Sequence, residues 1–258
     1  MRRSRILFAL MALLAVTLLA AGCGDDDNPS NPGGGGGGSD QFDQTSAETM
    51  ADANVQQAVM LADNINEIGQ GVDTAKSGNY QWNPEEQRWE FHYQWDYQGF
   101  HYVWDLSVQY LDADGNPVQH RADATSAHHI MDGSGSYQTT NDGTTITWLG
   151  TYHWDVTVSG LHTGTYTATG GGTYSADYTV QGGAFNMSRH YVIDWEILDP
   201  GLVKPAGGCP TGTVRFTMAP YVLDVVFDGT DTANWSLKNA GGDVVDSGTR
   251  SLDCGSSS

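Results

Sequence analysis

The clearest pattern in the chain is an alternation of aromatic and polar residues that begins near Trp82. In its first segment every second residue is aromatic, at positions Trp89, Phe91, Tyr93, Trp95 and Tyr97. The alternation resumes between residues 100 and 110, where polar residues such as His101 and Asp105 stand between apolar ones. Successive side chains of a β-strand point to opposite faces, so this period of two predicts strands with one aromatic face and one polar face.

Two six-residue segments in this region are nearly identical, FHYQWD at 91–96 and FHYVWD at 100–105. A hairpin with Gln98 and Gly99 as its two loop residues accounts for both segments, because a short loop brings them side by side in antiparallel register. On the aromatic face this register pairs Tyr97 with Phe100, Trp95 with Tyr102, Tyr93 with Trp104 and Phe91 with Leu106. On the polar face it pairs His92 with Asp105 and Asp96 with His101.

Turn-forming residues recur along the rest of the chain and divide it into further strands. Glycine, aspartate, asparagine and proline gather at 112–116, 132–135, 141–143, 170–172, 182–183 and 199–201. The expected fold is mainly β, an antiparallel meander preceded by one N-terminal helix, and it could form a barrel, a half-barrel or a sandwich. A transmembrane barrel is disfavoured, because tyrosine and tryptophan fill the middles of the strands instead of only two girdles.

One segment ahead of the sheet has helical periodicity. Between residues 45 and 68 small and apolar residues recur at steps of three and four, and Gly69 follows as a stop. Thr45 and Glu48 have the spacing of a capping box, which predicts the start of a helix. The helix is expected to pack on the core of the β domain, and contact with a partner protein is the alternative.

The first residues of the chain have the features of an export signal. A short basic segment, MRRSR, is followed by the apolar run ILFALMALLAVTLLAA and then by Gly22 and Cys23. This run is short for a membrane-spanning helix, which needs about 20 residues. The residues Leu19-Ala20-Ala21-Gly22-Cys23 resemble the lipobox of bacterial lipoproteins. The resemblance implies cleavage before Cys23, acylation of that cysteine with fatty acids such as palmitate, and anchoring to a membrane.

The region after the cysteine predicts a tether. Residues 24–40 include six consecutive glycines flanked by polar residues, a composition typical of a flexible spacer. Because Gly24 follows the cysteine, the lipoprotein resemblance implies the outer membrane in an organism that has one. The expected organisation is a signal peptide at 1–22, an acylated cysteine and tether at 23–40, a helical segment at 41–78 and an antiparallel β domain at 79–258, whose C-terminal part is 203–258.

The charge of the chain limits its partners. The sequence has 31 acidic and 11 basic residues and a net charge of −20, and three of the arginines lie in the expected signal peptide. Nucleic acid binding requires clustered lysine and arginine, so nucleic acid is not expected as a partner. The acidity is instead typical of a protein that stays soluble outside the cell.

Cys209 and Cys254 are the remaining cysteines and lie 45 positions apart. An isolated pair in an exported protein usually forms a disulfide, so a bond between them is predicted. Closing such a loop would stabilise the fold by about 3–4 kcal/mol. The spacing of a CxxC redox motif is absent, which argues against a catalytic role.

Histidines and aspartates are the candidates for metal binding, and the pattern disfavours them. His92 and Asp96 are four residues apart on a strand, roughly 13 Å, so the two His–Asp pairs of the hairpin cannot share one ion. His128 and His129 are weak candidates: in a strand their rings would point to opposite faces, and only a loop would let them chelate an ion with Asp132. No metal or other cofactor is therefore expected.

No nucleophile elbow, phosphate-binding loop or HExxH motif occurs, so the sequence does not favour an enzyme. Three function classes are considered. The first is a membrane-tethered binding or scaffold module of the cell envelope, with a protein or an envelope polymer as partner. The second is a lipocalin-like carrier of a small apolar ligand, and the third is a hydrolase of envelope polymers or polysaccharides.

Overall fold

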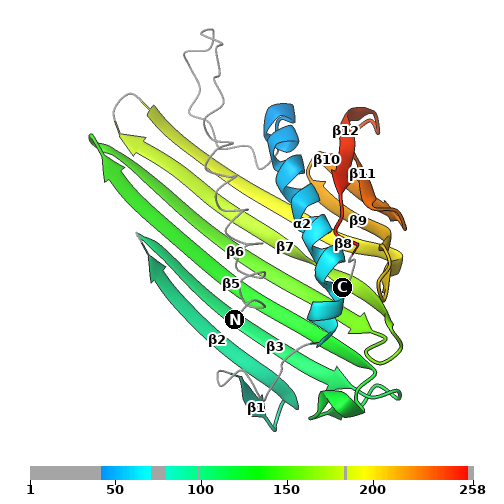
Figure 1. Ribbon diagram of the computed structural model, residues 1–258. Helices are drawn as coiled ribbons and strands as arrows, with labels where there is room; N and C mark the ends of the chain where they lie inside the picture. The colour runs from blue at the N-terminus through cyan, green and yellow to red at the C-terminus, as the bar shows by residue number, and fades with distance from the viewer. Residues whose placement is uncertain (1–41, 71–79, 98, 183–184, 255–258) are drawn as a thin grey trace.

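A computed structural model describes residues 42–70, 80–97, 99–182 and 185–254 (Figure 1). The expected signal peptide, Cys23, the tether and the loop residue Gln98 lie outside these residues. One α-helix, α2 (Gln44–Gln70), precedes the strands β1 (Gln81–Asn83), β2 (Arg88–Tyr97), β3 (Phe100–Leu111), β4 (Pro117–Val118), β5 (Ser126–Asn141), β6 (Thr144–Ser159), β7 (Thr165–Gly182), β8 (Phe185–Pro205), β9 (Thr211–Met218), β10 (Tyr221–Asp228), β11 (Thr232–Lys238) and β12 (Val244–Ser251). A single turn of 3-10 helix, η1 (Arg121–Asp123), lies between β4 and β5.

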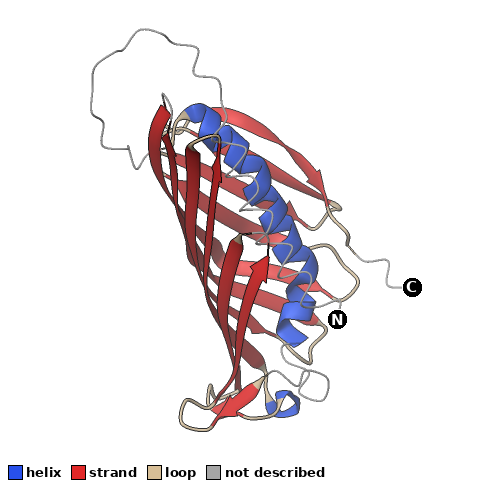
Figure 2. Ribbon diagram, turned by 90° about the vertical axis from the view of Figure 1, so that its left-hand side faces the viewer, coloured by secondary structure: helices blue, strands red, loops and turns tan. Residues whose placement is uncertain are grey.

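The strands form one open, antiparallel sheet of 12 strands. Its order is β1-β2-β3-β5-β6-β7-β8-β9-β10-β11-β12, and β4 pairs with β3 outside this path. Nearly every strand is therefore bonded to its neighbour in sequence, which confirms the predicted mainly-β meander preceded by one helix. The first and last strands do not pair with each other, so the sheet does not close into a barrel (Figures 1 and 2).

Helix α2 lies along one face of the sheet, which we call the inner face (Figures 1 and 2). The helix contacts strands β6 to β12. Its fully buried side chains are mostly small, including Ala47, Ala51, Ala58 and Ala62, so that the helix backbone approaches the sheet closely. The expectation that the helix packs on the core of its own domain is confirmed.

The start of α2 differs from the predicted capping box. The carboxylate Oδ1 of Asp43 accepts a hydrogen bond of 2.7 Å from the backbone N–H of Ser46, so Asp43 caps the helix. Thr45 lies inside the first turn, where its carbonyl oxygen accepts the hydroxyl of Thr49. Aspartate at the N-cap satisfies a free N–H and also carries a charge that favours the helix N-terminus, which explains why the helix begins earlier.

The predicted β2–β3 hairpin is confirmed in every pair. Tyr97 lies opposite Phe100, and the register continues through Trp95 with Tyr102 to Phe91 with Leu106. Gly99 in the loop has a φ of 86°, a conformation that costs glycine little. The alternation of aromatic and polar residues therefore fixes both the turn and the face of each side chain.

Three predicted turns are wrong, because their residues lie inside long strands. Residues 132–135 are in the middle of β5, and residues 170–172 are inside β7. Residues 199–201 are inside β8, at an irregularity in its pairing with β9. A Cβ atom at Gly133 would come within 2.9 Å of the Trp104 ring, and one at Gly135 within 2.8 Å of the Trp148 ring. These glycines make room for tryptophan side chains of neighbouring strands instead of turning the chain.

The C-terminal strands confirm the predicted disulfide. Cys209 lies just before β9 and is bonded to Cys254, which follows β12. The bond therefore joins the two ends of a four-stranded part of the sheet. Among the described residues no helix is both long and apolar enough to cross a bilayer.

Candidate functional site

The face of the sheet opposite α2, which we call the outer face, carries a series of His–Asp pairs. Five histidines each hydrogen-bond one aspartate at 2.6–2.8 Å: His92 with Asp105, His101 with Asp96, His128 with Asp155, His153 with Asp132 and His190 with Asp177. The first two are the pairs predicted from the hairpin. In each pair the imidazole ring and the carboxylate are hydrogen-bonded to each other. No group of three or more potential ligands able to hold a metal ion occurs among the described residues.

The adjacent histidines of β5 lie on opposite faces, as their position in a strand requires. His128 points to the outer face, where its Nε2 is 2.7 Å from Asp155 Oδ1. The His129 ring is buried on the inner side with its Nε2 unpartnered, and burial lowers the pKa of His129 to about 4. The two rings cannot bind one ion from these positions, and His129 is uncharged at neutral pH.

The inner face of the sheet is only partly covered by α2. The helix contacts β6 to β12, whereas the hairpin β2–β3 lies away from it (Figure 1). Aromatic side chains that α2 does not cover therefore remain at this end of the sheet, two of them exposed and three half-buried. We call them the aromatic shelf, which consists of Trp95, Tyr97, Phe100, Tyr102 and Tyr137. Trp95 is 41% exposed and Tyr97 is 53% exposed, which is unusual for side chains of this size.

The rings of the aromatic shelf lie nearly parallel and stack on one another in a row. Trp95 stacks on Tyr97 with ring centroids 5.4 Å apart and an interplanar angle of 11°. Trp95 also stacks on Tyr102 at 5.7 Å, and Phe100 stacks on Tyr137 at 4.1 Å. Because cross-strand neighbours hold each ring, the shelf is ordered before anything binds to it.

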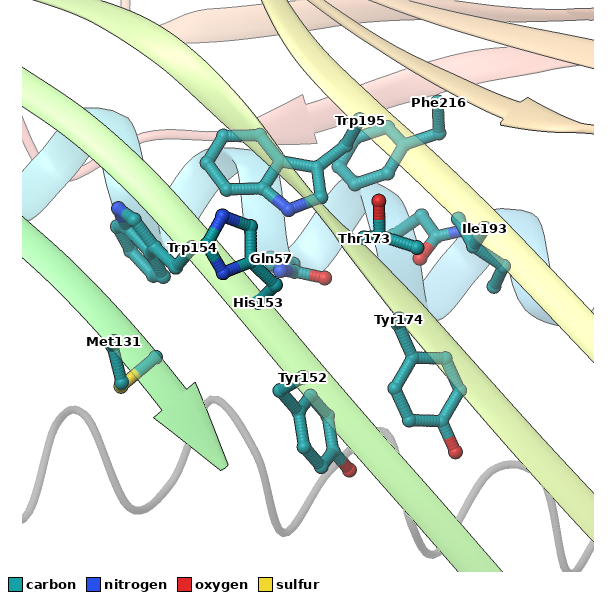
Figure 3. Close-up of a pocket in the computed structure, with 11 residues that line it drawn as sticks. Gln57, Met131, Tyr152, His153, Trp154, Thr173, Tyr174, Ile193, Trp195 and Phe216 are labelled. Atoms are coloured by element: carbon teal, nitrogen blue, oxygen red, sulfur yellow. The ribbon is translucent and has the colours of Figure 1, made fainter. Parts of the chain in front are cut away.

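A pocket lies farther along the inner face, between the sheet and α2 (Figure 3). Asn54 and Gln57 of the helix line one side, and the sheet contributes aromatic residues that include Tyr152, Trp154 and Tyr174. The enclosed space is about 30 Å³, which holds about one water molecule. Ring contacts of 5.6 Å between Trp104 and Tyr152 and 4.7 Å between Tyr152 and Tyr174 join mostly buried aromatic residues of the inner face to the pocket.

Two buried polar atoms that line the pocket have no hydrogen-bond partner, Trp154 Nε1 and Asn54 Oδ1. The hydroxyl of Tyr174 instead interacts with the hydroxyl of Tyr152 and with the indole of Trp148. The hydroxyls of Tyr152 and Tyr174 point the same way, away from Trp195 and Phe216 (Figure 3). A buried polar atom left unpaired costs about 1–3 kcal/mol, so a water molecule bound beside Trp154 and Asn54 would recover that cost.

The two tyrosine hydroxyls stay protonated at physiological pH. Burial raises the pKa of Tyr152 well above its usual value. Burial also raises the pKa of Tyr174, and hydrogen bonds with Trp148 and Tyr152 offset only part of that effect. Both hydroxyls are therefore neutral at physiological pH.

The sequence pattern predicted the aromatic face but did not reveal its division into a covered and an open part. The alternation does not distinguish the exposure of Trp95 from that of the fully buried Trp148, because both are aromatic residues on the apolar side of a strand. Their difference in exposure depends on how far α2 reaches across the sheet. No family model, curated protein sequence or solved structure matches this chain.

Proposed function

We propose that this chain is a membrane-tethered lipoprotein of the cell envelope whose open inner face binds an uncharged envelope polymer, a glycan chain. The proposal depends on one observation: two exposed aromatic rings, Trp95 and Tyr97, lie at the open end of a row of aromatic residues on the inner face that leads toward the pocket beside α2. The lipobox-like N-terminus supports the envelope location, and the acidic surface supports an exported, soluble domain.

The chemistry of the inner face favours sugar rings over purely apolar molecules. A pyranose ring has an apolar C–H face that can pack on Trp95 or Tyr97, and hydroxyls at its rim that can stay hydrated on the open side of these rings. A net charge of −20 disfavours polyanionic chains, so a neutral glycan is the better match.

The carrier function is less well supported by the geometry. A lipocalin-like carrier needs an enclosed cavity of at least about 300 Å³ for a drug-sized ligand. The sheet is open, and the pocket beside α2 encloses about 30 Å³. A long ligand lying along the shelf fits this shape better than a small one enclosed within it.

Replacing an exposed ring of the aromatic shelf should weaken glycan binding. Trp95→Ala and Tyr97→Ala are each expected to reduce the affinity for a neutral chito-oligosaccharide about tenfold, because each removes one stacking surface. The affinity would be measured by calorimetry. Leu149→Ala is the matched control, since Leu149 is 51% exposed but lies on the outer face, and it should leave binding unchanged.

Two results would contradict the glycan proposal. One is equal binding by the wild-type protein and both shelf variants. The other is no binding of the oligosaccharide together with tight binding of an uncharged apolar dye such as N-phenyl-1-naphthylamine, which would favour the carrier.

The membrane anchor is tested separately through Cys23. Cys23→Ser removes the thiol that would carry the acyl chains, and two such chains are needed for stable anchoring. The variant should therefore move from the membrane fraction to the soluble fraction when cells are broken. Gly24→Ser, at the neighbouring position, should stay with the membranes; membrane association of Cys23→Ser at the wild-type level would refute the anchor.

A further inference from the structure

Within the part of the chain that the structure describes, the outer edge of β2 carries no strand over most of its length. Strand β1 pairs only with residues 88–90 of β2, whereas β3 pairs with β2 from Trp89 to Tyr97. Among the described residues, segment 91–97 therefore has a strand neighbour on one side only. The backbone N–H and C=O groups that point away from β3 form a ready-made template for another strand.

The other edge of the sheet is protected in a way that β2 is not. Strand β12 is eight residues long, carries Asp246 and Arg250, and contains Gly248 in its middle. It is also irregular, because its register with β11 shifts between Leu237 and Lys238. Charges, glycine and bulges are the features that keep an edge strand from pairing, whereas segment 91–97 of β2 contains no glycine and keeps a regular register with β3.

We propose that the free edge of β2 binds the same edge of a second copy of this chain. The two β2 strands would run antiparallel about a two-fold axis at Gln94, so that Gln94 of each copy lies opposite Gln94 of the other. Such a contact uses the same surface on both copies and closes after two, as expected for a symmetric dimer.

The argument depends on the near-identity of the segments FHYQWD and FHYVWD. Within the chain, three pairs illustrate how β2 lies against β3: Tyr97 with Phe100, Asp96 with His101, and Trp95 with Tyr102. In the symmetric dimer Tyr97, Asp96 and Trp95 would lie opposite residues of the second copy, namely Phe91, His92 and Tyr93 in that order. The same residue types would therefore meet on both sides of β2, and Gln94 would take the place of Val103.

The arrangement is also compatible with the charge on each face. On the outer face each Asp96 would lie opposite His92 of the other copy, so that like charges do not meet, and like charges directly opposite each other destabilise strand pairing. On the inner face Trp95 and Tyr97 would lie beside the aromatic residues of the second copy. The two aromatic shelves would become one continuous surface across a sheet of twice the width.

Cysteine cross-linking of the full-length chain in mild detergent tests this geometry. Gln94→Cys should form a disulfide-linked dimer under mild oxidation, because the two-fold axis places the residue beside its own copy. Ser134→Cys is the matched control: Ser134 is exposed on the same face and in the same row of the sheet, but it lies two strands inside the edge. It should give at least tenfold less dimer.

Sedimentation of the unmodified protein supplies the second measurement. The wild-type chain and Ser134→Lys should sediment as dimers, whereas Gln94→Lys should shift to monomers, because it places two lysines opposite each other. Gln94 is exposed, so its variants should keep the wild-type circular dichroism spectrum. A wild-type monomer at all concentrations, equal behaviour of the two lysine variants, or equal cross-linking at positions 94 and 134 would overturn the proposal.

Discussion

Trp148→Ala is expected to lower the free energy of unfolding by about 4 kcal/mol, as removal of a fully buried tryptophan side chain costs about 3–5 kcal/mol. Trp148 is 1% exposed and is the largest of the fully buried side chains. It lies on β6 beside Gly135 of β5, whose missing side chain accommodates the ring. Urea unfolding followed by tryptophan fluorescence would measure the loss, and Leu149→Ala on the exposed outer face should cost less than about 0.5 kcal/mol.

The same site predicts a coupling between two substitutions. Gly135→Ala alone should destabilise the protein by about 1–3 kcal/mol, since the new Cβ would lie 2.8 Å from the rings of Trp148 and Tyr102. In the Trp148→Ala background part of this cost should disappear, because one of the two rings is gone. A coupling energy of at least about 1 kcal/mol is expected from the double-mutant cycle, and strict additivity would show that the glycine does not accommodate the ring.

His129 should make the fold sensitive to acid. Burial lowers its pKa to about 4, whereas an exposed histidine in the unfolded chain has a pKa near 6.5. Between these values the unfolded state binds more protons, so stability falls as the pH drops from about 6.5 to about 4. The full shift corresponds to about 3 kcal/mol.

His129→Leu isolates this effect from that of the other titrating groups. The variant should lose about 2–3 kcal/mol less stability than the wild type between pH 7 and pH 4.5, as measured by urea unfolding at each pH. His128→Asn is the control, because His128 lies on the opposite, outer face and its substitution leaves the buried ring in place. If both variants keep the wild-type pH dependence, the buried ring is not the origin of the acid sensitivity.

The parts of the fold that the sequence predicts correctly are those set by neighbouring residues. The strict alternation around Trp95 and the echo of FHYQWD determine the β2–β3 hairpin, its register and its two His–Asp pairs. The small residues of α2 also predict a helix packed on its own domain, although the cap is Asp43 and not Thr45. A short-range pattern is sufficient in each case, because the relevant partners lie close in the chain.

The parts that the sequence does not predict depend on contacts between distant strands. Glycine normally indicates a turn, but Gly133 and Gly135 are needed inside β5 because tryptophans from β3 and β6 occupy the space above them. The candidate site has the same origin. Nothing local to β2 indicates that α2 stops short of it, so the exposure of Trp95 and Tyr97 follows only from the curvature of the sheet and the path of the helix.

The bond between Cys209 and Cys254 changes how this open sheet can come apart. An edge strand such as β12 would ordinarily fray first, and the opening would then spread inward one strand at a time. Because the bond joins the residues that flank β9 to β12, the loose end stays attached at the base of β9. A protease that cuts the turn between β11 and β12 would therefore leave both pieces held together, and β12 would be released only after reduction.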